Sequence, residues 1–533
     1  MANMAVSLSR VVGPLAGLGC LVLSALSIPK AEADDREANV GPTNVGAILM
    51  SVEALVEAKS DKFPTDIAVI GAGIGGASSA YYLRKLFGSD VSIDMYEPHS
   101  VGGRLATTKI GDKEFESGGS IIHPKNHYMV KFAEQLGLKH RKSLPSQFAL
   151  YNGQEFVFTE SSSSLLTLAK LLWRYGWDCV RLNKLIGQTL THFENIYTLQ
   201  DGGNAYSSVE ELLYAMGGTR FVNMTQKSVT EGLKEEGFSA RFINELAMAA
   251  MRENYGQTVD IPFFVGAVSL AGAQEGLWSV EGGNKRVPEE LVKTAKVNLI
   301  PGEVSKVMLD KSGDRPKFLL QYQVKDPNDN QILTEQKGYD IVIVATPLNE
   351  GISNITFTGF PTPLPEVKGK FHRTVANFVQ GKLNAEYFGI LDPKSAPTGI
   401  MTVNADILFN SIGKHNPVTI PKDYSPVGPE SEDAVWKVFS QRPLTDSEIG
   451  QLFTVVKKTQ VVDWLAYPCY TCPGHLGTFV LHDGLYYVNN IEWAASAMEM
   501  SAIGGRNVAL LSYNWWHGLD GKVDPGRTTK TEL

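Results

Sequence analysis

One short loop constrains the fold of this chain more than any other feature of its sequence. Gly71, Gly73 and Gly76 have the spacing G-x-G-x-x-G, and they stand between an apolar run, residues 66–70, and a helical pattern, residues 77–86. A buried strand, a glycine turn and a helix form the dinucleotide-binding unit of α/β proteins, in which the pyrophosphate rests on the helix N-terminus. The sequence therefore predicts an α/β protein built on a Rossmann-like parallel sheet.

The residues after this loop indicate which dinucleotide binds. A second strand is predicted over residues 91–96, and it ends at Glu97, which stands 21 residues after Gly76. An acid at this position is expected to accept the ribose hydroxyls and disfavours the 2′-phosphate of NADP, so FAD and NAD remain. The glycine spacing occurs once beyond the N-terminal segment. One tightly bound dinucleotide suits an oxidase better than a reductase with two cofactor modules.

Composition excludes several classes of protein. The chain has 533 residues, of which 43% are hydrophobic and 20% charged, as in globular proteins rather than disordered or many-spanning membrane proteins. The net charge of −8 offers no positive field for a phosphate backbone, so no nucleic acid is expected as a partner. No metal site is expected, since no second pair of Cys or His ligands accompanies Cys469 and Cys472. For these two cysteines, a local disulfide and two packed thiols both stay open.

Apolar periodicity divides the chain into two interleaved parts and two ends. Helical patterns over residues 162–174, 209–216 and 229–252 indicate a helical insertion between the strands of the first part. The predicted organisation is a signal peptide over 1–33, a polar leader over 34–62, a Rossmann-like FAD-binding domain over 63–125, 283–350 and 481–518, a discontinuous α+β substrate domain over 126–282 and 351–480, and a tail over 519–533.

The two ends of the chain indicate a compartment. Residues 11–28 are apolar and precede a small-residue cleavage sequence, which predicts a secretory signal; a retained membrane anchor is the alternative. In the secretory pathway, Asn223 and Asn354 would become glycosylation sites, because both stand in Asn-x-Thr triplets. Residues 530–533, Lys-Thr-Glu-Leu, differ at one position from the ER retrieval signal, so retention in the ER also stays open.

Further motifs resemble those of the amine-oxidase-like flavoproteins. Gly103 and Arg104 follow Glu97 closely and resemble a Gly-Gly-Arg segment that contacts FAD in that family. The pair Gly118 and Gly119 resembles the next flavin-facing glycines of the family, and Val304 falls where its members make a backbone contact to adenine. The resemblance implies that these five residues bind FAD together with the glycine loop and Glu97.

A closer resemblance, covering residues 63–518, is to the prenylcysteine oxidase family, whose plant members are called farnesylcysteine lyases. It depends on the order of four stretches, residues 70–76, 101–106, 118–124 and 493–503. It implies an FAD-dependent thioether oxidase that cleaves S-prenyl-L-cysteine, farnesyl or geranylgeranyl, with O2 and water to a prenyl aldehyde, free cysteine and H2O2, in the degradation of prenylated proteins. It also implies a lysosomal or vacuolar setting, and peripheral membrane contact stays open.

Such a reaction needs few protein side chains, because hydride loss from the carbon between sulfur and alkene to FAD N5 requires no prior acid or nucleophile. Two candidates are nevertheless identified. His123, beside the glycine pair, could place water or relay a proton, and Glu499 starts the last helix, where the backbone N–H groups of Met498 and Glu499 are expected to meet the flavin ring. A hydrogen-bonded turn histidine and an ordinary first-turn carboxylate are the alternative interpretations.

Two further expectations concern the remaining walls of the site. Leu165, Leu172, Trp173 and Phe242 are candidates for a prenyl channel, although core packing explains the same apolar stripe. Many flavoproteins with this loop carry an Asp near the C-terminal flavin contact, whereas residues 487–492 here read Tyr-Val-Asn-Asn-Ile-Glu. Which side chain meets the ribityl phosphates is therefore left open.

Two other functions compete with the thioether oxidase. One is an FAD amine oxidase with another substrate, which a peroxide assay on farnesylcysteine and on a polyamine would separate. The other is a non-catalytic prenyl carrier, which a colourless purified protein would favour. The intact glycine loop and Glu97 argue against the carrier.

Overall fold

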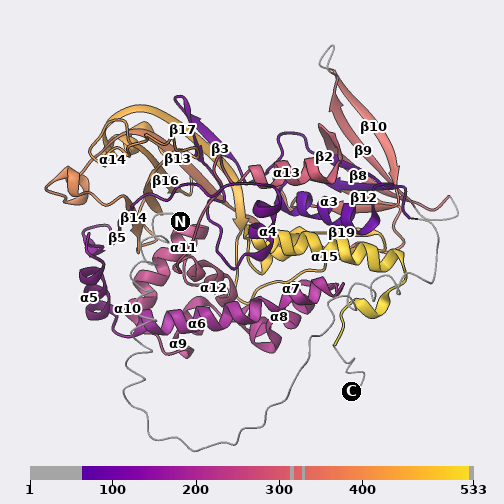
Figure 1. Cartoon of the computed structure of the whole chain (residues 1–533), viewed down its shortest axis with the longest axis horizontal. Helices are drawn as coiled ribbons and strands as arrows, with labels where there is room; N and C mark the ends of the chain where they lie inside the picture. The colour runs from indigo at the N-terminus through magenta and orange to yellow at the C-terminus, as the bar shows by residue number, and fades with distance from the viewer. Residues whose placement is uncertain (1–62, 313–316, 327–330, 527–533) are drawn as a thin grey trace, which may run out of the picture.

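The chain forms two halves that lie side by side (Figure 1). The computed structural model describes residues 63–312, 317–326 and 331–526. The predicted signal peptide, the predicted leader and the Lys-Thr-Glu-Leu end lie outside these described residues. One half, here the Rossmann half, contains the predicted parallel sheet, and the second half contains a larger sheet and most of the helices. The predicted α/β class with a Rossmann-like part is confirmed.

The Rossmann half is built on a six-stranded sheet whose centre is the first strand of the described chain. β1 (Asp66–Ile70) pairs in parallel with β2 (Ser92–Tyr96) and with β11 (Ile341–Val344), which is far away in sequence. Parallel neighbours need a crossover, and α3 (Ile74–Phe87) supplies it between β1 and β2. The order is β18-β19-β11-β1-β2-β7, with β18 (Val480–His482) and β7 (Asn298–Ile300) at the edges and β19 (Leu485–Tyr487) between β18 and β11.

Different layers cover the two faces of β1, which is why its apolar run is continuous. Ile67 and Val69 belong to the core that includes the helices, whereas Ala68 and Ile70 lie under a small sheet. The helices of this half are α3, α13 (Arg286–Ala295) and α15 (Met498–Trp516). The small sheet has the order β10-β9-β8-β12, with β10 (Ile332–Tyr339), β9 (Lys317–Lys325), β8 (Gly302–Asp310) and β12 (Thr356–Thr358).

The second half consists of a seven-stranded sheet above a helical layer (Figure 1). The sheet has the order β17-β13-β16-β15-β14-β5-β6, with β17 (Phe453–Pro468), β13 (Phe371–Leu383), β16 (Val435–Ser440), β15 (Ser411–His415), β14 (Gly399–Thr402), β5 (Phe148–Tyr151) and β6 (Phe156–Thr159). The helices are α5 (Ser164–Tyr175), α6 (Asp178–Phe193), α7 (Asn195–Asp201), α8 (Val209–Met224), α9 (Val229–Glu235), α10 (Ala240–Phe242), the π-helix η2 (Ile243–Ala247), α11 (Met248–Tyr255) and α12 (Phe263–Ala271).

Several smaller elements complete the fold. The hairpin of β3 (Thr107–Ile110) and β4 (Lys113–Glu116) forms a two-stranded sheet, and α4 (His127–Gln135) packs against α15. The remaining helices are α14 (Asp446–Leu452), which begins with a capping box of Thr445 and Glu448, and short 3-10 turns including η5 (Asn489–Trp493) and η6 (Asp520–Lys522).

The helical layer differs from the prediction in two ways, in the pattern over residues 229–252 and in helices that were not predicted. The pattern over residues 229–252 is not one helix but α9, α10, η2 and α11, and Gly237, with φ of +82°, separates the first from the rest. The predicted helix over residues 209–216 ends where α8 is interrupted, because Gly217 and Gly218 have non-helical backbone angles, and a second helical stretch continues to Met224. α6 and α12 were not predicted. Since seven of the nine residues of α12 are buried, its sequence carries no amphipathic period that could be recognised.

Two of the domain boundaries in the structure differ from the predicted ones. β12 pairs with β8 in the Rossmann half, so the chain crosses into the second half after residue 358 rather than at 350. The tail begins later than residue 519, because Val523 forms a bridge with Ala205, and Asp524 accepts hydrogen bonds from the N–H and hydroxyl of Ser207. Among the helices of the described ranges, none combines the length and apolar composition of a membrane-crossing segment.

Candidate cofactor and substrate site

A cavity of about 730 Å³ lies where the two halves meet. Its wall on one side comes from the carboxyl ends of β1 and β2 and the start of α15, and on the other from α6, α12, β13 and β17. The carboxyl edge of a parallel sheet is where ligands bind in such folds. The wall contains most of the predicted site residues, namely Gly71, Gly73, Glu97, Gly103, Arg104, Gly118, Gly119, His123, Val304, Met498 and Glu499. Gly76 lies behind Gly71, outside this wall.

The three glycines of the loop have separate steric roles. Gly71 has φ of +100°, and a Cβ there would stand 2.8 Å from the carbonyl oxygen of Ala345. A Cβ on Gly76 would stand 2.0 Å from the carbonyl oxygen of Gly71, so the start of α3 can approach β1 only through glycine. A Cβ on Gly73 would have one neighbour within 4 Å, the oxygen of Gly102 at 3.9 Å, and would project into space that a ligand needs.

The N-terminus of α3 is suited to an anion. Gly73 is its N-cap, and no side chain caps the helix, so its first N–H groups face the cavity side of the loop. A helix N-terminus carries partial positive charge, and this one stands at the carboxyl edge of the sheet. The arrangement fits the pyrophosphate of a dinucleotide.

Glu97 is fixed by the backbone at the end of β2. Its Oε2 accepts the N–H of Ala72 at 3.1 Å, and its Oε1 accepts the N–H of His99 at 3.0 Å. The carboxylate is thereby tied to the glycine loop itself. Val304, on β8, also forms part of the cavity wall and is buried. Glu97 and Val304 therefore share the cavity wall with the glycine loop, as the adenosine end of a dinucleotide requires.

Arg104 forms a bidentate ion pair with a residue that the sequence left unassigned. Its Nη1 and Nη2 lie 2.7 and 2.6 Å from the two carboxylate oxygens of Glu492, and its Nη1 also donates to the carbonyl of Ala466. Burial acts to raise the pKa of Glu492, but the guanidinium and three side-chain hydrogen bonds, including those of Asn489 and Ser496, outweigh it, so the pKa is lowered. The unusual segment 487–492 thus anchors Arg104.

The glycine pair lies in a narrow gap. A Cβ on Gly118 would stand 1.8 Å from the carbonyl oxygen of Arg104, and one on Gly119 would stand 2.8 Å from the side chain of Leu105 and 3.5 Å from that of Met498. Both glycines, Leu105 and Met498 are part of the cavity wall. The gap brings the Gly-Gly-Arg segment, the glycine pair and the start of α15 to one place.

Glu499 connects α15 to α4. Its carboxylate accepts the N–H groups of Tyr128 and Met129 at 2.8 and 2.9 Å and the hydroxyl of Tyr197 at 2.7 Å. Burial raises its pKa to about 7 against the effect of these donors. The geometry is that of a cap on the N-terminus of α4, and a catalytic role for Glu499 stays a prediction.

Both ring nitrogens of His123 are engaged. Nδ1 accepts the N–H of Lys125 at 3.0 Å, which leaves the ring proton on Nε2, where it donates to Oε1 of Gln274 at 3.1 Å. Burial lowers the pKa of His123, so the ring is neutral. A proton relay through His123 would first have to break one of these bonds, and this role also stays a prediction.

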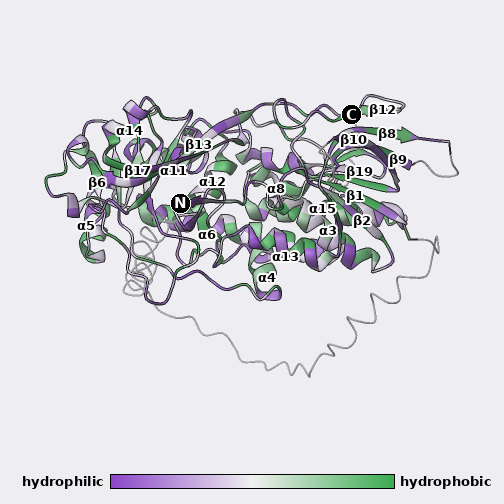
Figure 2. Ribbon diagram, turned by 90° about the horizontal axis from the view of Figure 1, so that it is seen from above, coloured by the Kyte–Doolittle hydropathy of each residue, from purple (hydrophilic) through white to green (hydrophobic). Residues whose placement is uncertain are grey.

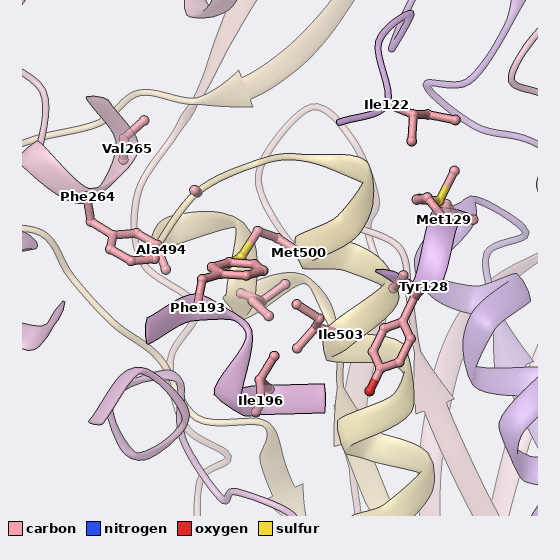
Figure 3. Close-up of a cluster of buried hydrophobic side chains, with 14 of the residues drawn as sticks. Ile122, Tyr128, Met129, Phe193, Ile196, Phe264, Val265, Ala494, Met500 and Ile503 are labelled. Atoms are coloured by element: carbon pink, nitrogen blue, oxygen red, sulfur yellow. The ribbon is translucent and has the colours of Figure 1, made fainter. Parts of the chain in front are cut away.

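The apolar wall of the cavity comes from elements that the sequence did not indicate. α6 and α12 contribute Ile186, Leu190, Phe193, Phe264, Ala267, Val268 and Ala271. Figure 3 shows Phe193 beside Met500 of α15 and Phe264 beside Ala494. None of the four predicted channel residues, Leu165, Leu172, Trp173 and Phe242, is in the wall: Leu165 and Trp173 are 79% and 87% exposed, and Phe242 is fully buried elsewhere.

Three buried polar atoms of the wall have no hydrogen-bond partner among the described residues: Oδ1 of Asn489, Oδ1 of Asn254 and Oγ1 of Thr374. Asn489 stands next to the Arg104–Glu492 pair, because its Nδ2 donates to Glu492. Its free oxygen is an acceptor at the place where a hydroxylated cofactor chain would pass. Together with the space at Gly73, it indicates a cradle that fits a flavin-type dinucleotide.

The cysteines do not form a site. Cys469 and Cys472 are free thiols in the structure, and so is the buried Cys179. No group of three or more His, Cys, Asp or Glu side chains within the described ranges is arranged to hold a metal ion.

Comparison with known proteins adds to this geometry. A family model described as prenylcysteine lyase matches residues 158–525, and one described as an NAD(P)-binding Rossmann-like domain matches residues 69–136. Prenylcysteine oxidase 1 of Homo sapiens is 44% identical over 483 residues, 88% of this chain and 94% of that protein. Prenylcysteine oxidase 1-like of Bos taurus is 41% identical over 494 residues, 91% of this chain and 99% of that protein.

A solved structure shares the fold. A triple mutant of putrescine oxidase matches with a TM-score of 0.52, covering 84% of this chain and 98% of that one, at 14% sequence identity. At this identity the similarity concerns the arrangement of the elements and not the substrate.

Proposed function

The chain belongs to the prenylcysteine lyase family, and on that premise we propose that it is an FAD-dependent thioether oxidase. Its substrate would be S-prenyl-L-cysteine, cleaved with O2 and water to a prenyl aldehyde, free cysteine and H2O2. The observation that carries this proposal is one continuous cavity that joins a dinucleotide cradle to an apolar pocket between α6 and α12. A prenyl chain needs such an apolar pocket, and an oxidase needs it to end at the cofactor.

FAD, when bound, supplies the two-electron acceptor that O2 can reoxidise. Gly71, Gly73 and the N-terminus of α3 would hold its pyrophosphate, Glu97 its ribose and Val304 its adenine, while Gly103, Arg104, Gly118, Gly119 and Met498 would border its flavin end. The unpartnered oxygen of Asn489 would receive a ribityl hydroxyl.

The chain's own contribution is orientation and exclusion of water. Phe193, Phe264 and Met500 form an apolar wall that would hold the prenyl chain in one direction and keep bulk water from its reacting carbon. Glu499 fixes the start of α15 through two hydrogen bonds from α4 and one from Tyr197 of α7, so the helix N-terminus keeps its place beside the glycine pair. His123, with both ring nitrogens engaged and its pKa lowered by burial, would orient the turn over residues 123–126 rather than carry protons.

The direct test is a peroxide assay on the purified protein. We expect a yellow protein that releases FAD on heating and produces H2O2 with S-farnesylcysteine but not with putrescine. Peroxide with the amine alone would favour the amine oxidase, and a colourless protein that binds farnesylcysteine without peroxide would favour the prenyl carrier.

We further propose that the protein works in the lumen of the secretory pathway, in the lysosome or vacuole. Two observations support it: Asn223 and Asn354, the two glycosylation acceptors, are both exposed. The predicted signal and the Lys-Thr-Glu-Leu end lie outside the described residues, so ER retention remains the alternative. Glycosidase sensitivity of the protein from cells, with Asn223→Gln and Asn354→Gln as controls, together with its co-localisation with organelle markers, tests this proposal.

Peripheral contact with a membrane is the last part of the proposal, and α5 supports it. This helix lies at the outer end of the helical layer in both views (Figure 1, Figure 2). Leu165, Leu166, Trp173 and the following Trp177 are 79%, 51%, 87% and 70% exposed, which is unusual for residues of this size. Residues 161–184 contain four basic residues and one acid, in a chain of net charge −8. Exposed tryptophans beside basic residues suit an anionic lipid surface.

Vesicle sedimentation tests this contact. We expect binding to vesicles that contain phosphatidylserine, weaker binding to neutral vesicles, and loss of binding in Leu165→Ser/Trp173→Ser. Equal sedimentation of this variant and the unchanged protein would contradict a role for α5.

A further inference from the structure

Two of the unpartnered polar atoms on the cavity wall belong to the second half of the molecule. Asn254, at the end of α11, is 8% exposed, and Thr374, on β13, is 6% exposed. Oδ1 of the first and Oγ1 of the second have no hydrogen-bond partner among the described residues, although both side chains belong to the wall. A buried polar group without a partner lowers stability, so such a group in a cavity indicates a ligand that supplies the missing bond.

The orientation of the Asn254 carboxamide is fixed by its neighbour. Its Nδ2 donates to the carbonyl oxygen of Ser269 at 3.3 Å and also contacts the hydroxyl of that residue. A carbonyl oxygen can only accept, so the amide nitrogen must face Ser269. The carboxamide oxygen is therefore the free atom, and it can only accept a hydrogen bond.

Thr374 lies beside a residue that approaches the glycine pair. It stands opposite Trp464 in the pairing of β13 with β17, and Trp464 is itself in the cavity wall. The ring of Trp464 comes within 3.3 Å of the place where a Cβ on Gly118 would stand. The Thr374 hydroxyl is thus on the strand surface that faces the flavin end of the cradle.

α11 and β13 meet beside these two residues. Gly256, which ends α11, approaches β13 so closely that a Cβ on it would stand 2.8 Å from Nε2 of His372. Asn254 and Thr374 each lie two residues from this contact, on the same cavity wall. The contact therefore brings together the two elements that carry the free carboxamide oxygen and the free hydroxyl, both on the wall of one cavity.

The charges around the cavity decide which ligand group fits these two oxygen atoms. Two acids of the wall, Glu97 and Glu499, are held by N–H or O–H donors of the chain, and Arg104 is paired with Glu492. The third acid, Glu303, is exposed and lies on β8 in the Rossmann half. A carboxamide oxygen and a hydroxyl oxygen suit a group rich in N–H donors. In S-prenylcysteine that group is the α-ammonium, which lies on the opposite side of the sulfur from the prenyl chain.

We propose that Asn254 and Thr374 bind the α-ammonium group of the substrate and so select free prenylcysteine over prenyl thioethers that lack this group. The inference rests on the proposed function and adds the residues that bind the amino-acid end of the substrate. The apolar wall of α6 and α12 would then hold the prenyl chain, and the sulfur and its neighbouring carbon would be positioned between the two ends.

The test compares two substrates in variants of the holoenzyme. S-farnesylcysteine carries the ammonium, and 3-(farnesylthio)propanoic acid lacks it but keeps the thioether and carboxylate. We expect kcat/KM of the unchanged protein to favour farnesylcysteine by about 10- to 100-fold, the range of a hydrogen-bonded charged group. Asn254→Leu and Thr374→Val should each lower kcat/KM for farnesylcysteine, largely through KM, and leave the value for the propanoic acid nearly unchanged.

Ser269→Ala is the matched control, because it removes one contact of Asn254 and leaves the free carboxamide oxygen. It should keep the ratio of the two kcat/KM values. Flavin absorbance reports whether each variant remains folded and binds its cofactor. If Asn254→Leu loses flavin, Thr374→Val, which keeps the side-chain shape, tests the inference instead.

Equal losses on both substrates in the two variants would overturn the inference, because they would indicate a structural role. So would an unchanged protein that oxidises both thioethers equally well. If the flavin-loaded protein oxidises neither thioether, the proposed function itself fails, and this outcome is distinct from a loss of selectivity.

Discussion

The two halves of the molecule build their sides of the cavity in different ways. The Rossmann half uses backbone: three glycines, one helix N-terminus and Glu97 lie within 27 consecutive residues, 71–97, and two of those glycines are required by contacts of 2.8 and 2.0 Å. The second half uses side chains from α6, α11, α12 and β13, which are separated by long stretches of sequence. A cofactor site made of local backbone tolerates almost no change, whereas a substrate wall made of distant side chains can be altered one residue at a time.

The largest effect is expected at the glycine loop. Gly73→Ala should keep the fold, because a Cβ there meets only the oxygen of Gly102 at 3.9 Å, but it should remove bound flavin and lower activity more than 100-fold, by roughly 3 kcal/mol or more. Flavin absorbance and circular dichroism measure the two properties. Gly76→Ala is the contrasting variant, since its clash with the oxygen of Gly71 should also reduce folded protein. A yellow, active Gly73→Ala protein would contradict the cofactor site.

The next effect concerns the ion pair beneath the cradle. Arg104→Met leaves the carboxylate of Glu492 buried without its partner, which should lower the free energy of unfolding by about 3 to 5 kcal/mol. Urea denaturation of the apoprotein measures it. The double variant Arg104→Met/Glu492→Met removes both charges and should recover part of the loss; an equal or larger loss in the double variant would show that the pair acts through packing.

Glu499 should make stability depend on pH. Its folded-state pKa is about 7 and its ordinary value 4.5, so between these values the folded protein holds a proton that the unfolded chain has released. Relative to Glu499→Gln, the unchanged protein should therefore gain stability as pH falls from about 7 to 4.5, by up to about 3 kcal/mol. Urea denaturation of both proteins at pH 7.5 and pH 5 measures the difference, and a constant difference would contradict the assignment. Comparison with the variant removes the opposing contribution of buried histidines such as His123.

The smallest effect separates the observed apolar wall from the predicted one. Leu190→Ala, in the wall, should raise KM for farnesylcysteine about tenfold through lost apolar contact, whereas Leu165→Ala, on the exposed face of α5, should leave KM unchanged with soluble substrate. Steady-state kinetics of the two variants measures this contrast. A larger increase in KM for Leu165→Ala than for Leu190→Ala would indicate that α5 forms the prenyl channel.

Several features of this protein were determined by its sequence alone. The strand, loop, helix and second strand over residues 66–97 formed as predicted, because glycine spacing and buried apolar runs are local properties that only a few backbone arrangements satisfy. Residues 103, 104, 118 and 119 were identified through family resemblance, and the structure brings them to the cavity wall. Their individual roles stay predictions.

Tertiary structure alone decided the rest. Asn489 and Glu492 were visible only as a departure from a family pattern until the fold placed them beside Arg104, and Asn254 and Thr374 carry no local signal at all. The four channel candidates are not in the cavity wall, because an apolar stripe on a helix does not determine which element, if any, packs across from it. Periodicity reports the conformation of neighbouring residues, whereas a substrate pocket depends on which distant elements pack together, and that is set by the whole chain.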